Sequence, residues 1–209
     1  MFPSKTAASL SALILLLSLT ACTGAGGADA GPPVPAASTG ASAGLGAEAD
    51  ALLAGYDITA PATVPDLIEQ LQAQPLADRP KGLMASVRVD ELLLTSGDDE
   101  LSLPLPDDQF HLSVAPYLAE THECFYHSLT TCVGELGDED FHVTITDDAS
   151  SKVLFDSDVT TYDNGFFDVT LPAGLDITVL IDDGEHTVEL PLGTRVEDPT
   201  CVTTAQLHV

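Results

Sequence analysis

From residue 82 onward, apolar side chains alternate with polar ones at every second position in many short segments. Successive residues of a β-strand point to opposite faces, so this period of two predicts strands with one face buried in a core. The clearest such segments are residues 85–89, 110–114, 141–145, 167–171, 175–181, 188–190 and 201–209. Turns rich in Gly, Pro and Asp separate them, without the strand–helix–strand rhythm of a parallel sheet. The pattern therefore predicts an antiparallel β-sandwich.

A short helical segment is expected before the strands, over residues 47–80. Thr63 suits an N-cap, Pro65 falls in the first helical turn, and apolar residues recur at helical spacing over residues 64–71. The apolar face of this segment must pack on something, either the sandwich or a second copy of the chain. We therefore predict an α+β fold in which this small helical segment precedes a β-sandwich domain over residues 81–209.

The N-terminus predicts export. A basic start is followed by an apolar run, Leu10–Leu19, that is too short to span a bilayer comfortably. The tetrad Leu-Thr-Ala-Cys at positions 19–22 then resembles the lipobox of bacterial lipoproteins. We expect a lipoprotein signal peptide over residues 1–21, then the lipidated Cys22 and a flexible linker to residue 46. Such a lipid would anchor the protein at the outer face of a bacterial membrane, in the periplasm or at the cell surface. An ordinary signal peptide with a chance cysteine is the alternative.

The chain carries 33 acidic and six basic residues, a formal net charge of −27. Such a surface repels nucleic acid and concentrates cations loosely around itself, so we expect no nucleic-acid partner. The acidic runs lack the spacing of a calcium loop and are typical of solvated turns. The sequence also contains no nucleophile elbow, P-loop or H-E-x-x-H zinc motif.

Two cysteines and two histidines fall within the eleven residues from His122 to Cys132. With Cys22 assigned to a lipid, an odd number of thiols remains, and outside the reducing cytoplasm one of them is left over from any disulfide scheme. As one helix, the stretch between its two cysteines would separate them by about 12 Å, too far to share an ion or a disulfide. Cooperation therefore predicts a hairpin or compact loop. The three remaining thiols are Cys124, Cys132 and Cys201.

Cys201 begins the last predicted strand, on the same side as Ala205 and Leu207, where a thiol at the rim of the sandwich can meet this loop. Thiolates with a nearby imidazole suit Cu(I) or Zn(II). Cu(I) accepts two or three ligands, whereas zinc normally takes four, which His127 or His122 would complete.

A purely structural reading of the cluster is equally compatible with the spacing. In it, a Cys124–Cys132 or Cys132–Cys201 disulfide staples the sandwich, with Tyr126 and Leu129 in the core. The other histidines alternate with apolar residues and are expected to face outward: His111, His142, His186 and His208.

The segment Cys-Phe-Tyr-His-Ser-Leu-Thr-Thr-Cys at 124–132, followed by Gly-Glu-Leu at 134–136, resembles the signature of the CueP-like envelope copper-binding proteins. Weaker matches at residues 84–88 and 198–204 extend the resemblance over about residues 47–209. It implies copper binding outside the cytoplasm, in copper resistance and delivery. His122 lies just outside the signature. The metal ligands that the resemblance implies are Cys124, His127, Cys132 and Cys201.

Residues and resemblance together predict an extracytoplasmic protein that holds Cu(I) through three cysteines, with His127 as auxiliary ligand, and acts in copper resistance or trafficking. A cysteine pair can also reduce Cu(II) while closing a disulfide, which an external thiol reductant must reopen. We expect copper ions, this reductant and an envelope protein that receives or exports copper as partners, and a metal-binding protein more than an enzyme. The alternatives are a surface lipoprotein interaction module with a structural disulfide, and a zinc-binding module.

Overall fold

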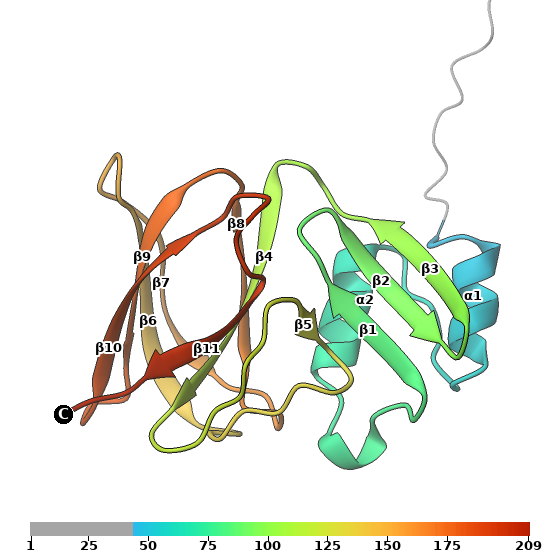
Figure 1. The fold of residues 1–209 in the computed structure, drawn as a ribbon, viewed down its shortest axis with the longest axis horizontal. Coiled ribbons are helices and arrows are strands. Elements are labelled where there is room, and N and C mark those ends of the chain that lie inside the picture. The colour runs from blue at the N-terminus through green and yellow to red at the C-terminus, as the bar shows by residue number, and fades with distance from the viewer. Residues whose placement is uncertain (1–43) are drawn as a thin grey trace, which may run out of the picture. The chain divides into compact units, whose positions relative to one another are not determined.

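The computed structural model describes residues 44–209 (Figure 1). The predicted signal peptide, Cys22 and nearly all of the predicted linker lie outside the described residues. The N-terminal elements are helices α1 (Ala47–Ala54) and α2 (Val64–Gln72), the 3-10 helix η1 (Leu76–Asp78), and strands β1 (Leu83–Val87), β2 (Glu91–Ser96) and β3 (Asp99–Pro104). The remaining strands are β4 (Gln109–Tyr117), β5 (His127–Ser128), β6 (Asp140–Asp147), β7 (Lys152–Thr160), β8 (Phe167–Pro172), β9 (Asp176–Asp182), β10 (Thr187–Gly193) and β11 (Cys201–Gln206).

The helices and the sheet β3-β2-β1-β5 enclose one apolar cluster. Helix α2 begins as predicted, because the Thr63 hydroxyl accepts a hydrogen bond from the Asp66 backbone N–H at 3.3 Å. Its apolar stripe, which includes Leu67 and Leu71, is buried together with residues of β1 and β2 such as Val87 and Leu92. Residues on both sides of position 80 therefore contribute to a single core.

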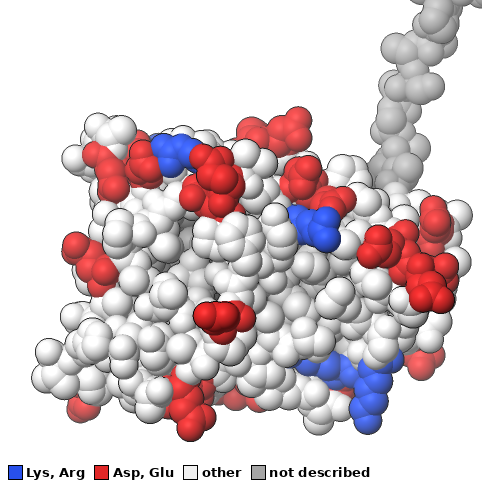
Figure 2. Space-filling model, viewed as in Figure 1, with Lys and Arg blue, Asp and Glu red and all other residues white. Residues whose placement is uncertain are grey.

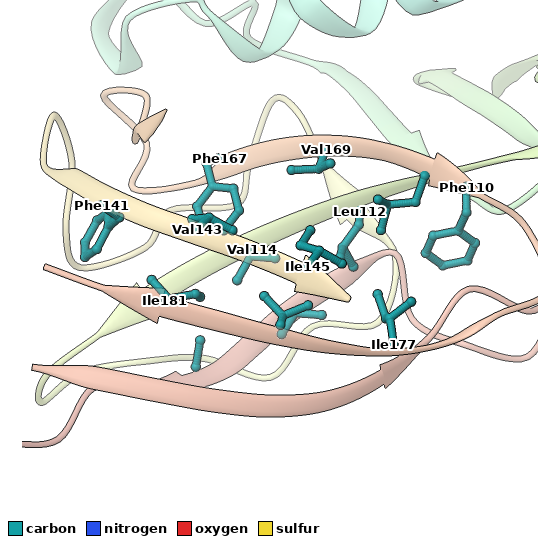
Figure 3. Close-up of a cluster of buried hydrophobic side chains, with 14 of the residues drawn as sticks. Phe110, Leu112, Val114, Phe141, Val143, Ile145, Phe167, Val169, Ile177 and Ile181 are labelled. Atoms are coloured by element: carbon teal, nitrogen blue, oxygen red, sulfur yellow. The ribbon is translucent and has the colours of Figure 1, made fainter. Parts of the chain in front are cut away.

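The larger core lies between two other sheets, β11-β4-β8 and β10-β9-β6-β7. Alternate residues of each strand point into it, and Figure 3 shows Leu112 and Val114 of β4 directed toward Ile145 of β6. The predicted α+β fold with an antiparallel β-sandwich is confirmed. Strands β2, β3, β5 and β7 were not singled out by the alternation in the sequence.

The last strand differs from the prediction in two ways. β11 pairs in parallel with β4, so the β11-β4-β8 sheet is mixed. Its register also shifts between Val202 and Ala205, and such a bulge changes which side chains share a face. Val202, rather than Cys201, therefore lies with Ala205 in the sandwich core. Cys201 instead packs with Ala115 and Phe166, which form a separate small cluster.

Acidic side chains are spread over the face of the described part shown in Figure 2, with Lys and Arg at only a few places. No helix within residues 44–209 is long and apolar enough to cross a membrane.

Candidate metal centre

The sulfur atoms gather on the face of the β11-β4-β8 sheet that is turned away from the sandwich core. The cluster formed by Ala115, Phe166 and Cys201 has Cys124 and Cys132 packed against it. The loop that carries these two cysteines includes β5, which pairs with β1 (Figure 1). The centre therefore lies where the N-terminal sheet meets the sandwich.

The loop folds back on itself as the cysteine spacing predicts. The Cys132 backbone N–H donates to the Ser128 carbonyl at 3.0 Å, and Cys124 Sγ lies 3.6 Å from Cys132 Sγ. The loop contains no glycine. The described residues with positive φ all lie outside it, so its turn needs no residue in the left-handed region. Of the two residues that the purely structural reading placed in the core, Leu129 is buried, but Tyr126 is 42% exposed and packs edge-on against Phe125.

A disulfide joins Cys124 to Cys201, with their Cα atoms 5.7 Å apart, and leaves Cys132 free. The prediction that one thiol is left over is confirmed, but neither pairing weighed from the sequence is the one present. The cause is the bulge in β11, which turns Cys201 away from the sandwich core. The Cys201 backbone N–H then donates to the Phe125 carbonyl at 3.1 Å and brings the two cysteines side by side.

All four predicted ligands lie close together. The ligand atoms of His127, Cys132 and Cys201 are within 4.8 Å of one another, and Cys201 Sγ is 3.7 Å from His127 Nδ1. A second group of the same kind consists of His122, Cys124 and Cys132. The centre thus contains three sulfurs and two imidazoles.

The buried Gln72 side chain at the end of α2 has a fixed amide orientation. The Phe166 backbone N–H donates to Asn164 Oδ1 at 3.0 Å, which leaves Asn164 Nδ2 to donate to Gln72 Oε1 at 3.2 Å. At the other end, Gln72 Nε2 donates to Asp168 Oδ1 at 3.1 Å, and an ionised carboxylate can only accept. Both ends require the Gln72 oxygen to face the histidine of the centre.

This orientation determines which nitrogen of His127 carries the proton. Gln72 Oε1 lies 3.0 Å from His127 Nε2, and an amide oxygen can only accept, so Nε2 is the donor. In the neutral ring, Nδ1 is then unprotonated and directs its lone pair toward the Cys201 sulfur. Hydrogen bonds of this kind commonly orient the histidine ligands of metals.

Burial keeps His127 neutral. Desolvation lowers its pKa to about 4, with smaller electrostatic contributions in the same direction from His111, Arg79 and His122, while Asp168 opposes the shift. Burial also raises the pKa of the Cys132 thiol, although the Ser128 backbone N–H and Arg79 act in the opposite direction. A metal at this position would meet a ready imidazole ligand and would displace a thiol proton.

Asp168 on β8 has a side chain only 11% exposed, and His111 of β4 lies beside it with Nε2 3.3 Å from Oδ2. Burial acts to raise the pKa of this carboxyl, but the contact with His111 and the charges around it outweigh burial and leave the pKa below its usual value. The prediction that His111 faces outward is wrong, because this face of β4 is covered and the side chain is only 13% exposed. His142 and His208 are exposed as predicted, and His186 lies half-buried in a turn beside Asp183.

The cysteine loop is held in place on two sides. The Gly134 N–H donates to the Asn164 carbonyl at 2.7 Å, and a Cβ on Gly134 would lie only 2.9 Å from the Gly165 carbonyl oxygen. On the other side, the buried Thr200 hydroxyl donates to the Val87 carbonyl at 2.6 Å and accepts from the His127 backbone N–H at 3.2 Å. These contacts tie the loop both to the sandwich and to β1.

Sequence reasoning missed Gln72, Asn164, Thr200 and Asp168. A weak signal existed for Gln72, which follows Leu71 directly on the apolar stripe of α2. Asp168 sits between Phe167 and Val169 in an alternating strand, so its parity alone indicated exposure.

Comparison with known proteins adds to this geometry. A sequence model of a family described as "Periplasmic copper-binding protein CueP" matches residues 66–206. The crystal structure named "Crystal Structure of S.CueP" resembles this chain with a TM-score of 0.71 and 32% sequence identity, covering 78% of this chain and 99% of that one. No curated protein matches the chain.

Proposed function

Because the chain belongs to the CueP family of periplasmic copper-binding proteins, we propose that it holds copper as Cu(I) through three thiolates. The proposed ligands are Cys124, Cys132 and Cys201, with Nδ1 of His127 as an auxiliary ligand. The observation that carries this proposal is the convergence of the ligand atoms of His127, Cys132 and Cys201 within 4.8 Å. Cys124 Sγ, 3.6 Å from Cys132 Sγ, completes the set of sulfurs.

The chemistry of these donors fits copper. Thiolates and imidazole are soft or borderline ligands, and three sulfurs satisfy the two- or three-coordinate preference of Cu(I). Zinc is the second candidate, because His127 could supply the fourth ligand of a tetrahedral site.

Reduction of Cu(II) is the redox activity that we propose for the same sulfurs. Two thiols transfer two electrons to two Cu(II) ions, forming one disulfide and releasing two protons and two Cu(I) ions. The Cys124–Cys201 disulfide corresponds to the product of such a reaction. An external dithiol would return the two electrons and two protons and regenerate the thiols.

The proposed setting is the cell envelope, in copper resistance or copper delivery. The lipobox-like tetrad ending at Cys22 supports the further proposal that a lipid tethers the protein to the membrane. An envelope protein that receives or exports copper would then be the partner at the membrane surface.

An anaerobic Cu(I) titration of the fully reduced, full-length protein against a chromogenic Cu(I) chelator tests the proposal. We expect one tightly held Cu(I) per chain, and at least about a hundredfold weaker binding after Cys132→Ser or Cys201→Ser, because each substitution removes a direct ligand. Cys22→Ser is the matched control, since it replaces a cysteine that is not a proposed ligand.

Unchanged affinity in Cys201→Ser would exclude the three-thiol site. Tighter binding of zinc than of copper by the same reduced protein, judged by competition, would favour the zinc module. A disulfide between two of these cysteines that persists under every redox condition would favour a purely structural role for them. For the redox activity, adding Cu(II) to reduced protein should consume one thiol for each Cu(I) that appears.

A further inference from the structure

The two groups of ligands in the centre overlap, and they differ in how they meet solvent. One consists of His122, Cys124 and Cys132, and the other of His127, Cys132 and Cys201. His127 and Cys201 are buried, whereas both cysteines of the first group are half-buried. An ion that arrives from solvent therefore meets the first group before the second.

Apart from packing on Phe166, His122 has no visible role among the described residues. Its Nε2 is shielded from solvent and has no hydrogen-bond partner in the described part of the chain. Its ring packs edge-on against Phe166, with the ring centroids 6.3 Å apart, and Phe166 also contacts the His127 ring at 4.4 Å. A shielded, unpaired imidazole nitrogen is costly in a native structure, and coordination of a metal ion would satisfy it. The neighbours of His122 in the sequence, Thr121 and Glu123, are exposed, so its segment lies at the surface.

We propose that His122, Cys124 and Cys132 form an outer site that captures Cu(I) first, and that Cys201 then displaces His122 to form the resting site. This inference rests on the proposed function. It assigns His122 as a ligand of the incoming ion only. The protein must be in the reduced state, in which an external dithiol has supplied two electrons and two protons to the Cys124–Cys201 bond.

The transfer is a single ligand exchange. The copper–nitrogen bond to His122 breaks while a copper–sulfur bond to Cys201 forms, and the sulfurs of Cys124 and Cys132 stay bound throughout. The Cys201 thiol releases its proton to water, and copper remains Cu(I). The lone pair of His127 Nδ1, 3.7 Å from the Cys201 sulfur, is placed to coordinate the ion once it has moved inward.

Such a role has a kinetic signature. A ligand that stabilises only an intermediate speeds uptake and release by the same factor and leaves the equilibrium affinity unchanged. A ligand of the resting site instead slows release and strengthens binding. His122→Gln therefore separates the two roles, provided that both rates are measured together with the affinity.

The experiment is stopped-flow exchange of Cu(I) between the reduced full-length protein and a chromogenic chelator, in both directions. We expect His122→Gln to slow uptake and release equally, by about tenfold, which corresponds to about 1.4 kcal/mol on the barrier. His122→Met should restore both rates, because it returns a soft donor. The matched control is His208→Gln, which removes an exposed imidazole outside the centre and should change neither rate.

Rates in His122→Gln equal to those of the control would overturn the outer site, with His122 then serving only to pack on Phe166. Weaker affinity with faster release would also overturn it, by placing His122 in the resting site. If the wild-type protein binds no Cu(I), the proposed function fails and the outer site fails with it. A thermal melt of each metal-free variant confirms that it folds.

Discussion

Replacing Gln72 by leucine keeps a helix-forming side chain of similar size at the end of α2 but removes an amide on which three buried groups depend. Its oxygen accepts from His127 Nε2 at 3.0 Å and from Asn164 Nδ2 at 3.2 Å, and its nitrogen donates to Asp168 Oδ1 at 3.1 Å. The side chain is fully buried, so water cannot substitute for it without opening the structure.

The magnitude follows from the groups left without partners. Each unpaired buried donor costs about 1–3 kcal/mol. The two donors, on His127 and Asn164, both lose their acceptor, whereas Asp168 keeps its contact with His111. Leucine recovers about 1–2 kcal/mol of this through apolar burial. We therefore expect the free energy of unfolding to fall by about 3 kcal/mol, and the urea midpoint by about 1.5 M at a typical slope of about 2 kcal/mol per M.

The assay is urea unfolding followed by circular dichroism at pH 7, with the Cys124–Cys201 disulfide intact. Gln70→Leu is the matched control, because Gln70 lies on the same helix and outside this network, and its effect should stay within about 0.5 kcal/mol. Nitrogen-15 NMR should also find the His127 proton on Nε2 in the wild type. In Gln72→Leu the neutral ring should be a mixture of the Nε2-protonated and Nδ1-protonated tautomers. A midpoint for Gln72→Leu within about 0.3 M of the control, or a wild-type proton on Nδ1, would refute the reasoning.

Two further predictions concern the same region. As the pH falls below 6.5, His127 becomes protonated in the unfolded chain, whereas in the folded chain it stays neutral until about pH 4. The metal-free protein should therefore lose up to about 3 kcal/mol of stability across this window, at about 1.4 kcal/mol per pKa unit. Urea midpoints at pH 7 and pH 4.5 should show this loss in the wild type and a smaller one in His127→Gln; equal losses would contradict it. Gly134→Ala should destabilise the protein by about 2 kcal/mol through overpacking against the Gly165 carbonyl. Gly44→Ala, with its nearest contact at 4.0 Å, should leave the stability unchanged, and thermal unfolding of the two variants measures the difference.

The sequence predicted what depends on local periodicity. The alternating segments became strands, Thr63 capped α2, and the spacing from Cys124 to Cys132 required the compact loop that is present. Each of these follows from residues a few positions apart, where the geometry of a helix or strand leaves few choices.

What the sequence could not predict depends on the placement of distant segments. The bulge between Val202 and Ala205 reverses the parity of Cys201, and so neither predicted disulfide is the one formed. Asp168 reads as exposed by alternation, yet Gln72 from α2 reaches it and covers that face. A period of two says which residues share a face but not what lies against it.

The pairing of β11 with β4 has a consequence for the newly made protein. β11 follows the other strands in the sequence, and its contact with β4 joins segments about ninety residues apart, of the kind that form slowly. Until that strand docks, Cys201 is far from the other two thiols and the three-sulfur cage does not exist. The proposed three-thiolate resting site is therefore completed late in maturation, so that a chain arrested partway through folding would still lack the ligand that Cys201 supplies.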